Sequence, residues 1–192
     1  MTMKRTHDDS ATTLGFWLYL MTDLMLFAAL FASFMVLRNG TAGGASAREL
    51  FDMNLVLTET MVLLASSLFC GLAWLAYRHG KRVDFVMYIV ATLVAGAVFL
   101  GIELTEFATL VGDGHGWQRS AFLSSYFALV GTHGLHIAVG LVWGIVLGVS
   151  VLRRGMNASM LRRFGLFSLF WHFLDIVWIF IFTIVYVIGG AA

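Results

Sequence analysis

The stretch from Ser120 to Leu152, SAFLSSYFALVGTHGLHIAVGLVWGIVLGVSVL, contains no Asp, Glu, Lys or Arg. As a helix rising about 1.5 Å per residue it would extend about 50 Å, whereas the hydrocarbon core of a bilayer is about 30 Å thick. Its apolar residues run continuously instead of alternating, which favours a membrane-spanning helix over a strand of a barrel. The segment therefore predicts a transmembrane helix that tilts or protrudes from the bilayer.

Four other apolar segments are also long enough to cross a membrane. They cover about residues 14–37, 54–77, 85–111 and 164–188. Each exceeds the roughly 18–20 residues that a span requires. Together with residues 120–152 they predict an all-α protein, an integral membrane bundle of five transmembrane helices. Because the loops between the spans are short, we expect residues 1–192 to form a single transmembrane domain.

The composition agrees with a membrane protein and excludes several other classes. Of the 192 residues, 60% are hydrophobic and 12% are charged, whereas about a quarter of an average soluble domain is charged. So few charges cannot cover a water-soluble body of this size, which excludes a soluble globular domain. The net charge of +1 offers no basic excess for nucleic acid, and the single cysteine, Cys70, can form no intrachain disulfide.

The distribution of Lys and Arg predicts the orientation in the membrane. With five spans, the N-terminal tail, the second loop and the fourth loop lie on one side. Of the 12 Lys and Arg residues, nine fall on that side, and Arg38, Arg48 and Arg119 fall on the other. Because positively charged loops stay in the cytoplasm, we expect a cytoplasmic N-terminus and a C-terminus outside the cytoplasm.

Eight acidic or histidine side chains lie within the expected spans, although an ionised side chain costs at least about 2.5–3.5 kcal/mol at the centre of a bilayer. They are Asp23, Glu59, Glu103, Glu106, His133, His136, His172 and Asp175. His133 and His136 are three residues apart and therefore share one helix face, and the same holds for His172 and Asp175. Both pairs lie near mid-depth. This leads to the hypothesis that they form one hydrogen-bonded cluster between the fourth and fifth helices.

Three interpretations of these polar residues remain open. They can hold helices together or bind lipid head groups, they can form a proton path through the carboxylates, or they can bind iron, copper or zinc. A haem held by His172 and one histidine of the fourth helix is a further form of the metal interpretation. The sequence contains no complete ligand set and no catalytic motif, so we predict no catalytic residue and no metal bound by this chain.

Two further patterns predict helix packing. Gly140, Gly144 and Gly148 repeat every four residues and give the fourth helix a smooth stripe for close approach. Trp171 and Trp178 are seven residues apart, which places them on one face of the fifth helix.

Stretches in the last two spans resemble a known family. Residues 131–140, GTHGLHIAVG, and residues 171–178, WHFLDIVW, are similar to signatures of subunit III of the haem-copper respiratory oxidases. Residues 15–23, GFWLYLMTD, and residues 39–44, NGTAGG, look closest to the quinol-oxidising branch. Within that branch, about residues 14–190 resemble subunit III of the cytochrome bo-type ubiquinol oxidases.

The resemblance implies a non-catalytic subunit of a proton-pumping ubiquinol oxidase in the respiratory chain of a bacterial inner membrane. Such a complex oxidises ubiquinol and reduces oxygen to water, with the haems and copper in subunit I and with subunits II and IV as further partners. The resemblance also implies a chain without the first two helices of the seven-helix mitochondrial type. It implies phospholipid near Asp23, where that type carries a glutamate. This subunit would supply structural support and bind lipid, and its C-terminus would be periplasmic.

Three alternatives remain open at this point. One is subunit III of a menaquinol-oxidising aa-type oxidase, because the quinone site belongs to other subunits. Another is a stand-alone proton-coupled transporter that uses Asp23, Glu103 and Glu106. The third is an integral membrane metalloenzyme.

Overall fold

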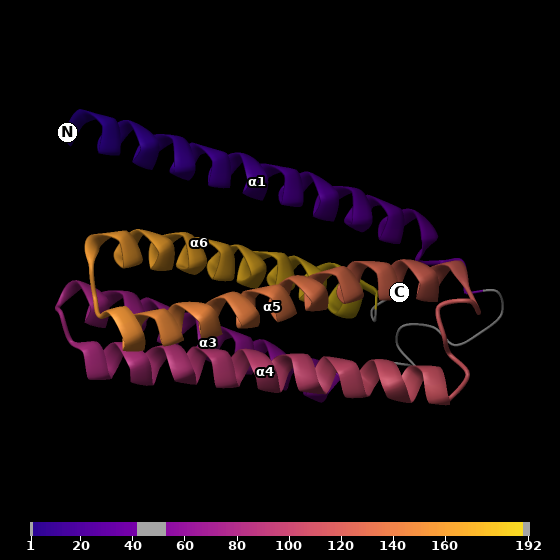
Figure 1. The fold of residues 1–192 in the computed structure, drawn as a ribbon. Coiled ribbons are helices and arrows are strands. Elements are labelled where there is room, and N and C mark those ends of the chain that lie inside the picture. The colour runs from indigo at the N-terminus through magenta and orange to yellow at the C-terminus, as the bar shows by residue number, and fades with distance from the viewer. Residues whose placement is uncertain (1, 42–52, 190–192) are drawn as a thin grey trace.

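In a computed structural model of the chain, residues 2–41 and 53–189 are described, with side chains from residue 11 onward. The regular structure in these residues is helical (Figure 1). The helices are α1 (Thr2–Leu37), α3 (Met53–Arg78), α4 (Arg82–Gly112), α5 (Ala121–Arg154) and α6 (Ala158–Ile181), which continues into the short π-helix η1 (Phe182–Ile188). Five stretches of helix are long and apolar enough to cross a membrane, which confirms the predicted all-α bundle with five spans.

The helix boundaries differ from the expected ones in the first span, where α1 begins at Thr2 and not near Leu14, and in the last span. α6 begins at Ala158, before the expected start near Phe164. The reason is a cap, because the Asn157 side chain accepts a hydrogen bond from the Met160 backbone N–H at 2.9 Å. At the other end the chain changes to the π-helix η1, which hydropathy does not predict. Arg48 and residues 42–44 lie outside the described residues.

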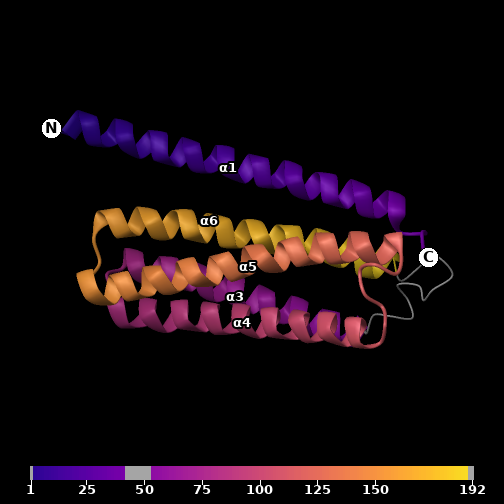
Figure 2. The ribbon, with the colours of Figure 1, turned by 45° about the vertical axis from the view of Figure 1, so that its right-hand side comes forward.

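α3, α4, α5 and α6 form a bundle, and α1 lies along the outside of this bundle (Figures 1 and 2). α1 packs mainly on α5 and less on α6. Its buried residues among those described are Leu20, Asp23, Phe27 and Phe34, whose spacings of three, four and seven place them on one face. The large apolar side chains on the other faces of α1 are exposed. A single narrow stripe therefore attaches α1 to the bundle.

Trp171 of α6 packs directly against glycines of two neighbouring helices. A Cβ atom at Gly96 of α4 would lie 2.8 Å from the indole ring, and one at Gly140 of α5 would lie 2.9 Å from it. A Cβ atom at Gly144 would lie 2.6 Å from a leucine of α4, whereas one at Gly148 would meet a single atom within 4 Å, at 3.9 Å. The glycine stripe of α5 is therefore a close helix contact at its first two positions.

Both tryptophans of α6 lie on one face, as their seven-residue spacing predicts, and this face turns toward α3. Trp171 Nε1 donates to Ser66 Oγ at 2.8 Å, and Trp178 Nε1 donates to Thr60 Oγ1 at 3.1 Å. Each hydroxyl in turn donates to a backbone carbonyl, that of Ser66 to α4 and that of Thr60 to its own helix. Because buried indole N–H groups need acceptors, these bonds fix the rotation of α6 about its axis.

Candidate functional site in the polar layer

On the side of α1, His136 of α5 faces Asp23. The Nε2 atom of His136 lies 3.7 Å from Asp23 Oδ2, and its Nδ1–H donates to the Thr132 carbonyl oxygen at 2.7 Å. The bond to the backbone of α5 fixes the ring, so that the other nitrogen is directed at the carboxyl group. This contact links α1 to α5, and the Asp23 carboxyl group also interacts with the Tyr19 hydroxyl of its own helix.

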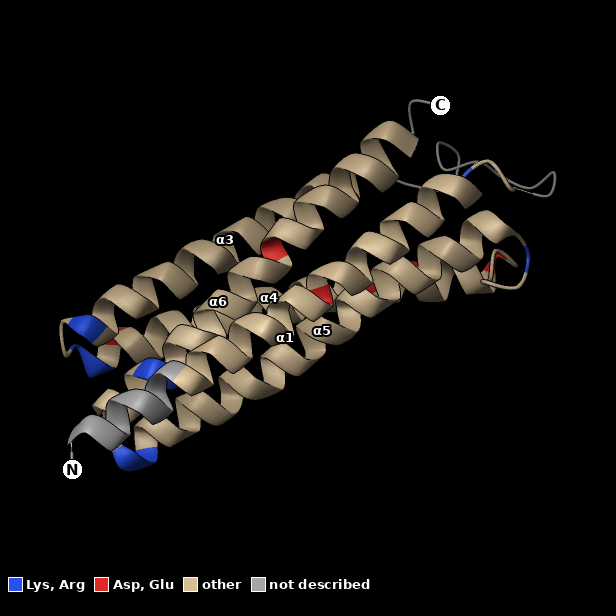
Figure 3. Ribbon diagram, turned by 90° about the horizontal axis from the view of Figure 1, so that it is seen from above, with Lys and Arg blue, Asp and Glu red and all other residues tan. Residues whose placement is uncertain are grey.

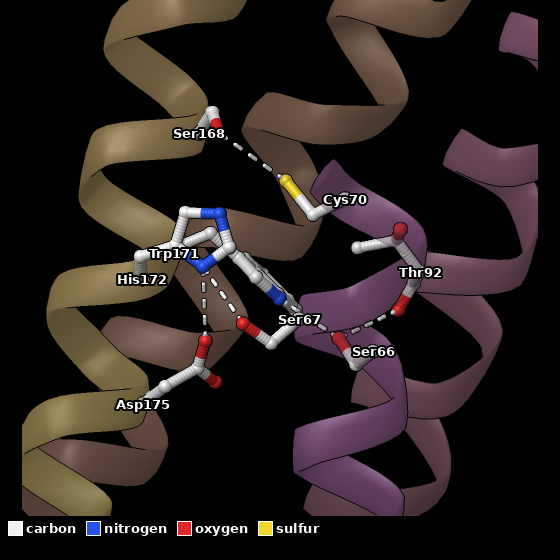
Figure 4. Close-up of polar contacts among 8 residues, drawn as sticks. All are labelled: Ser66, Ser67, Cys70, Thr92, Ser168, Trp171, His172 and Asp175. Atoms are coloured by element: carbon white, nitrogen blue, oxygen red, sulfur yellow. Dashed lines mark hydrogen bonds and ion pairs between the residues drawn. The ribbon is translucent and has the colours of Figure 1, made fainter. Parts of the chain in front are cut away.

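On the side of α3, His172 and Asp175 of α6 meet Ser67 (Figure 4). His172 Nδ1 lies 2.7 Å from Ser67 Oγ and 3.5 Å from Asp175 Oδ2. Both partners therefore share one imidazole nitrogen. In a Ser–His–Asp nucleophile site, the serine and the carboxylate bind opposite nitrogens. The arrangement here orients the imidazole and does not activate the serine.

The expected single cluster of four residues is not present among the described residues. No hydrogen bond or ion pair there joins the two histidines of α5 to the pair on α6. The rotation of α6 explains the difference, because the face that turns the tryptophans to α3 also carries His172 to Ser67. In addition, the ring of Phe27 from α1 contacts both helices, with its centroid 5.3 Å from that of His136 and 6.4 Å from that of Phe173.

His133 of α5 is fully buried and has no hydrogen-bond partner among the described residues. Its ring stacks on Trp178 at a centroid distance of 5.4 Å and meets Phe99 edge-on at 6.0 Å. Aromatic rings thus pack against this imidazole from α4 and α6. Within the described residues, no group of three or more His, Cys, Asp or Glu side chains is arranged to hold a metal ion.

The carboxyl groups of α3 and α4 form a separate polar region. Glu59 of α3 and Glu103 of α4 are both buried, and neither has a hydrogen-bond partner in the part of the chain that the structure describes. Both interact electrostatically with Glu106 of α4, and Glu103 also interacts with Glu59. A buried carboxyl group is costly when it is charged and unpaired, so carboxyl groups in hydrocarbon are normally neutral or paired.

Two tyrosines beside these carboxyl groups were missed by the sequence analysis. The hydroxyl oxygens of Tyr126 and Tyr186 are 3.1 Å apart, which joins α5 to η1 by a hydrogen bond. Both tyrosines interact electrostatically with Glu103 and Glu106. The only signal in the sequence is a phenolic hydroxyl within a span, which needs a partner when it is buried.

Comparison with known protein families gives a match over nearly the whole chain. Residues 3–190 match the family model described as cytochrome c oxidase subunit III. The chain belongs to this family. This confirms the resemblance to subunit III that residues 131–140 and 171–178 indicate.

Relatives of the chain come from several kinds of oxidase. The chain is 49% identical to cytochrome bo(3) ubiquinol oxidase subunit 3 of Pseudomonas aeruginosa, over 96% of this chain and 88% of the relative. It is 45% identical to quinol oxidase subunit 3 of Bacillus spizizenii, over 92% and 86%. It is 46% identical to cytochrome c oxidase subunit 3 of Bacillus sp. strain PS3, over 92% and 85%. Five apolar helices and bacterial relatives identify a multi-pass protein of the bacterial inner membrane.

Proposed function

We propose that this chain is subunit III of a proton-pumping ubiquinol oxidase of the cytochrome bo type. The observation that carries the proposal is the identity of 49% and 46%, over 96% and 95% of the chain, to two proteins with that name. In this role the chain packs against subunit I, within a complex that also holds subunits II and IV. Oxygen is reduced to water at the haem and copper of subunit I, ubiquinol is oxidised at a quinone site outside this chain, and this chain carries no redox centre.

The geometry supports a structural and lipid-binding role for the subunit. The polar groups of α5 and α6 form hydrogen bonds or pack against aromatic rings. Within the described residues, they form no set of three or more side chains arranged to hold a metal ion. α1 presents large apolar side chains to its surroundings, as expected of a helix that faces lipid or partner subunits. Asp23 faces His136, so phospholipid beside α1 would contact mainly the apolar neighbours of this carboxyl group.

A stand-alone proton-coupled transporter finds less support. Such a protein would connect Asp23 with Glu103 and Glu106 along one path. Asp23 instead pairs with His136 of α5, while the carboxyl groups of α4 interact with Glu59 of α3. The carboxyl groups thus belong to two regions of the bundle.

The proposed orientation is a cytoplasmic N-terminus and a periplasmic C-terminus. Most Lys and Arg residues lie at the end of the bundle that holds the N-terminus (Figure 3). Reporter fusions after Ala192 and within the loop that joins α5 to α6 test this. We expect a periplasmic signal from the first fusion and a cytoplasmic signal from the second, and the reverse pair of signals would contradict the orientation.

The test of subunit membership is isolation of the chain from its native membrane through a tag after Ala192. We expect a haem-containing large subunit to co-purify in a fixed ratio, identified by mass spectrometry and by the haem spectrum. Isolation of the folded chain as a separate oligomer without haem would contradict the proposal.

A further inference from the structure

A groove with a volume of about 340 Å³ runs between α1 and α6. On α1 its lining extends from Trp17 to Phe31, which corresponds to about 20 Å along a helix. Aromatic rings from both helices line it, including those of Phe27, Phe173 and Phe180. The groove is therefore long, narrow and almost entirely apolar.

One imidazole interrupts this apolar lining. The side chain of His172 is 42% exposed and lines the groove, while Ser67 and Asp175 hold its Nδ1 atom (Figure 4). Its Nε2 atom forms no hydrogen bond with the described residues, and it is accessible and not buried. A polar atom in hydrocarbon is costly unless it forms a hydrogen bond, so the groove needs an occupant that supplies one.

The depth of the groove restricts that occupant. His172 lies near the middle of the span Ala158–Ile188, so phospholipid head groups at the membrane surface lie about 15 Å away. A phospholipid would offer only hydrocarbon to this imidazole. A transmembrane helix satisfies its backbone hydrogen-bonding groups within itself, so its backbone offers this imidazole no partner. The occupant must therefore be largely apolar and must carry a hydrogen-bonding group at mid-depth.

We propose that this groove binds a prenylated quinol or quinone, with its ring beside His172 and its prenyl chain along α1 and α6. The proposal rests on the proposed function as a ubiquinol oxidase subunit, and it concerns binding of a second quinol molecule away from subunit I. An imidazole nitrogen accepts a hydrogen bond in one protonation state and donates one in another. It can therefore serve both a quinol hydroxyl and a quinone carbonyl, while the aromatic lining packs against the flat ring.

The experiment uses the complex isolated through a tag on this chain and placed in lipid nanodiscs free of quinone. The probe is a photoreactive azido-ubiquinol with a short prenyl chain, and labelled peptides are identified by mass spectrometry. We expect labelling of α1 and α6 that excess ubiquinol suppresses. His172→Leu should reduce it about tenfold, which corresponds to roughly one hydrogen bond of 1.4 kcal/mol. His172→Gln, which keeps a donor and an acceptor, should restore part of the labelling.

A matched pair of variants tests the groove without changing the imidazole. Ala28 lines the groove and the neighbouring Ala29 does not. Ala28→Trp should abolish labelling of α1 and α6, and Ala29→Trp should leave it unchanged. Equal labelling of the two variants, or competition by dioleoylphosphatidylethanolamine but not by ubiquinol, would overturn the proposal. If the tagged chain purifies without a haem-containing subunit, the proposed function fails, while labelling of the same preparation still decides whether the groove binds quinol.

Discussion

The two sides of α6 hold their neighbours in different ways. Toward α3, α4 and α5 the helix presents buried aromatic rings, the two indole N–H groups have acceptors on α3, and glycines of α4 and α5 lie against the Trp171 ring. Toward α1 it presents apolar residues and the exposed edge of His172, whose Nδ1 atom lies against Ser67 of α3, and a groove lies between the two helices beside their contact at Phe27 and Phe173. Close packing without voids and satisfied polar atoms specify one arrangement of helices, whereas a groove leaves space for another molecule.

This difference distinguishes helices whose positions are fixed within the chain from α1, which is held by fewer contacts. The arrangement of α3 to α6 depends on contacts between residues of this chain. Among the described residues, α1 is positioned by one stripe of buried residues and by the contact of Asp23 with His136, and the Phe122 N–H group donates to the Gly40 carbonyl oxygen just after the helix. Substitutions on the two sides of α6 should therefore differ in their effect on stability, and the following variants measure that difference.

The largest effect is expected at Gly140. Its new Cβ atom in Gly140→Ala would lie 2.9 Å from Trp171, whose ring cannot retreat because Gly96 lies against it and Ser66 binds its N–H group. We expect the free energy of unfolding in detergent to fall by about 1–3 kcal/mol. Gly148→Ala is the control, since its Cβ atom meets one atom at 3.9 Å, and it should be neutral or gain up to about 1 kcal/mol. Equal effects of the two variants would show that the Trp171 contact is not tight.

A smaller effect is expected for the bond between Trp171 and Ser66. A double-mutant cycle with Trp171→Phe and Ser66→Ala isolates the energy of this bond from the loss of packing. We expect a coupling of about 0.6 kcal/mol and no more than about 1.7 kcal/mol, the range measured for hydrogen bonds inside membranes. Zero coupling in unfolding measurements would mean that the indole bond does not fix the rotation of α6.

His133→Phe should leave stability unchanged or raise it. The imidazole is buried between Trp178 and Phe99 without a hydrogen-bond partner among the described residues, and removal of an unsatisfied polar group is favourable. The measurements are the free energy of unfolding and the ubiquinol turnover of the complex. Unchanged stability with lost turnover would assign His133 a role in proton movement and would contradict its structural role.

The smallest loss of stability is expected on the side of α1. Asp23→Asn keeps the shape of the side chain and changes a contact of 3.7 Å, longer than an ordinary hydrogen bond. We expect a loss of less than about 1 kcal/mol in detergent. A loss as large as that of Gly140→Ala would mean that α1 is attached as firmly as the other helices.

The sequence predicts the spans, the depth of the polar residues and the common face of the two tryptophans. These features follow from hydropathy and helical period, which depend only on neighbours along the chain. The partners of His136 and His172 could not be predicted in this way, because they depend on which helices are adjacent and on how each is rotated. Ser67 carries no special signal in the sequence, and it becomes a partner only because Trp171 and Trp178 turn α6 toward α3.

Tyr186 is a second feature that periodicity could not predict. It lies in η1, where the π-helical turn departs from the usual 3.6 residues per turn and changes the direction of its side chain. The early start of α6 depends likewise on a local hydrogen bond of Asn157, which hydropathy does not reflect.

The central claim is that this chain is subunit III of a ubiquinol oxidase. The most direct test is the oxygen consumption of the complex isolated through a tag on this chain, supplied in turn with ubiquinol, menaquinol and reduced cytochrome c. We expect rapid oxygen consumption with ubiquinol, together with a spectrum that shows reduction of the haems when ubiquinol is added. Oxygen consumption with menaquinol or cytochrome c but not with ubiquinol, or a haem-free preparation that consumes no oxygen, would contradict it.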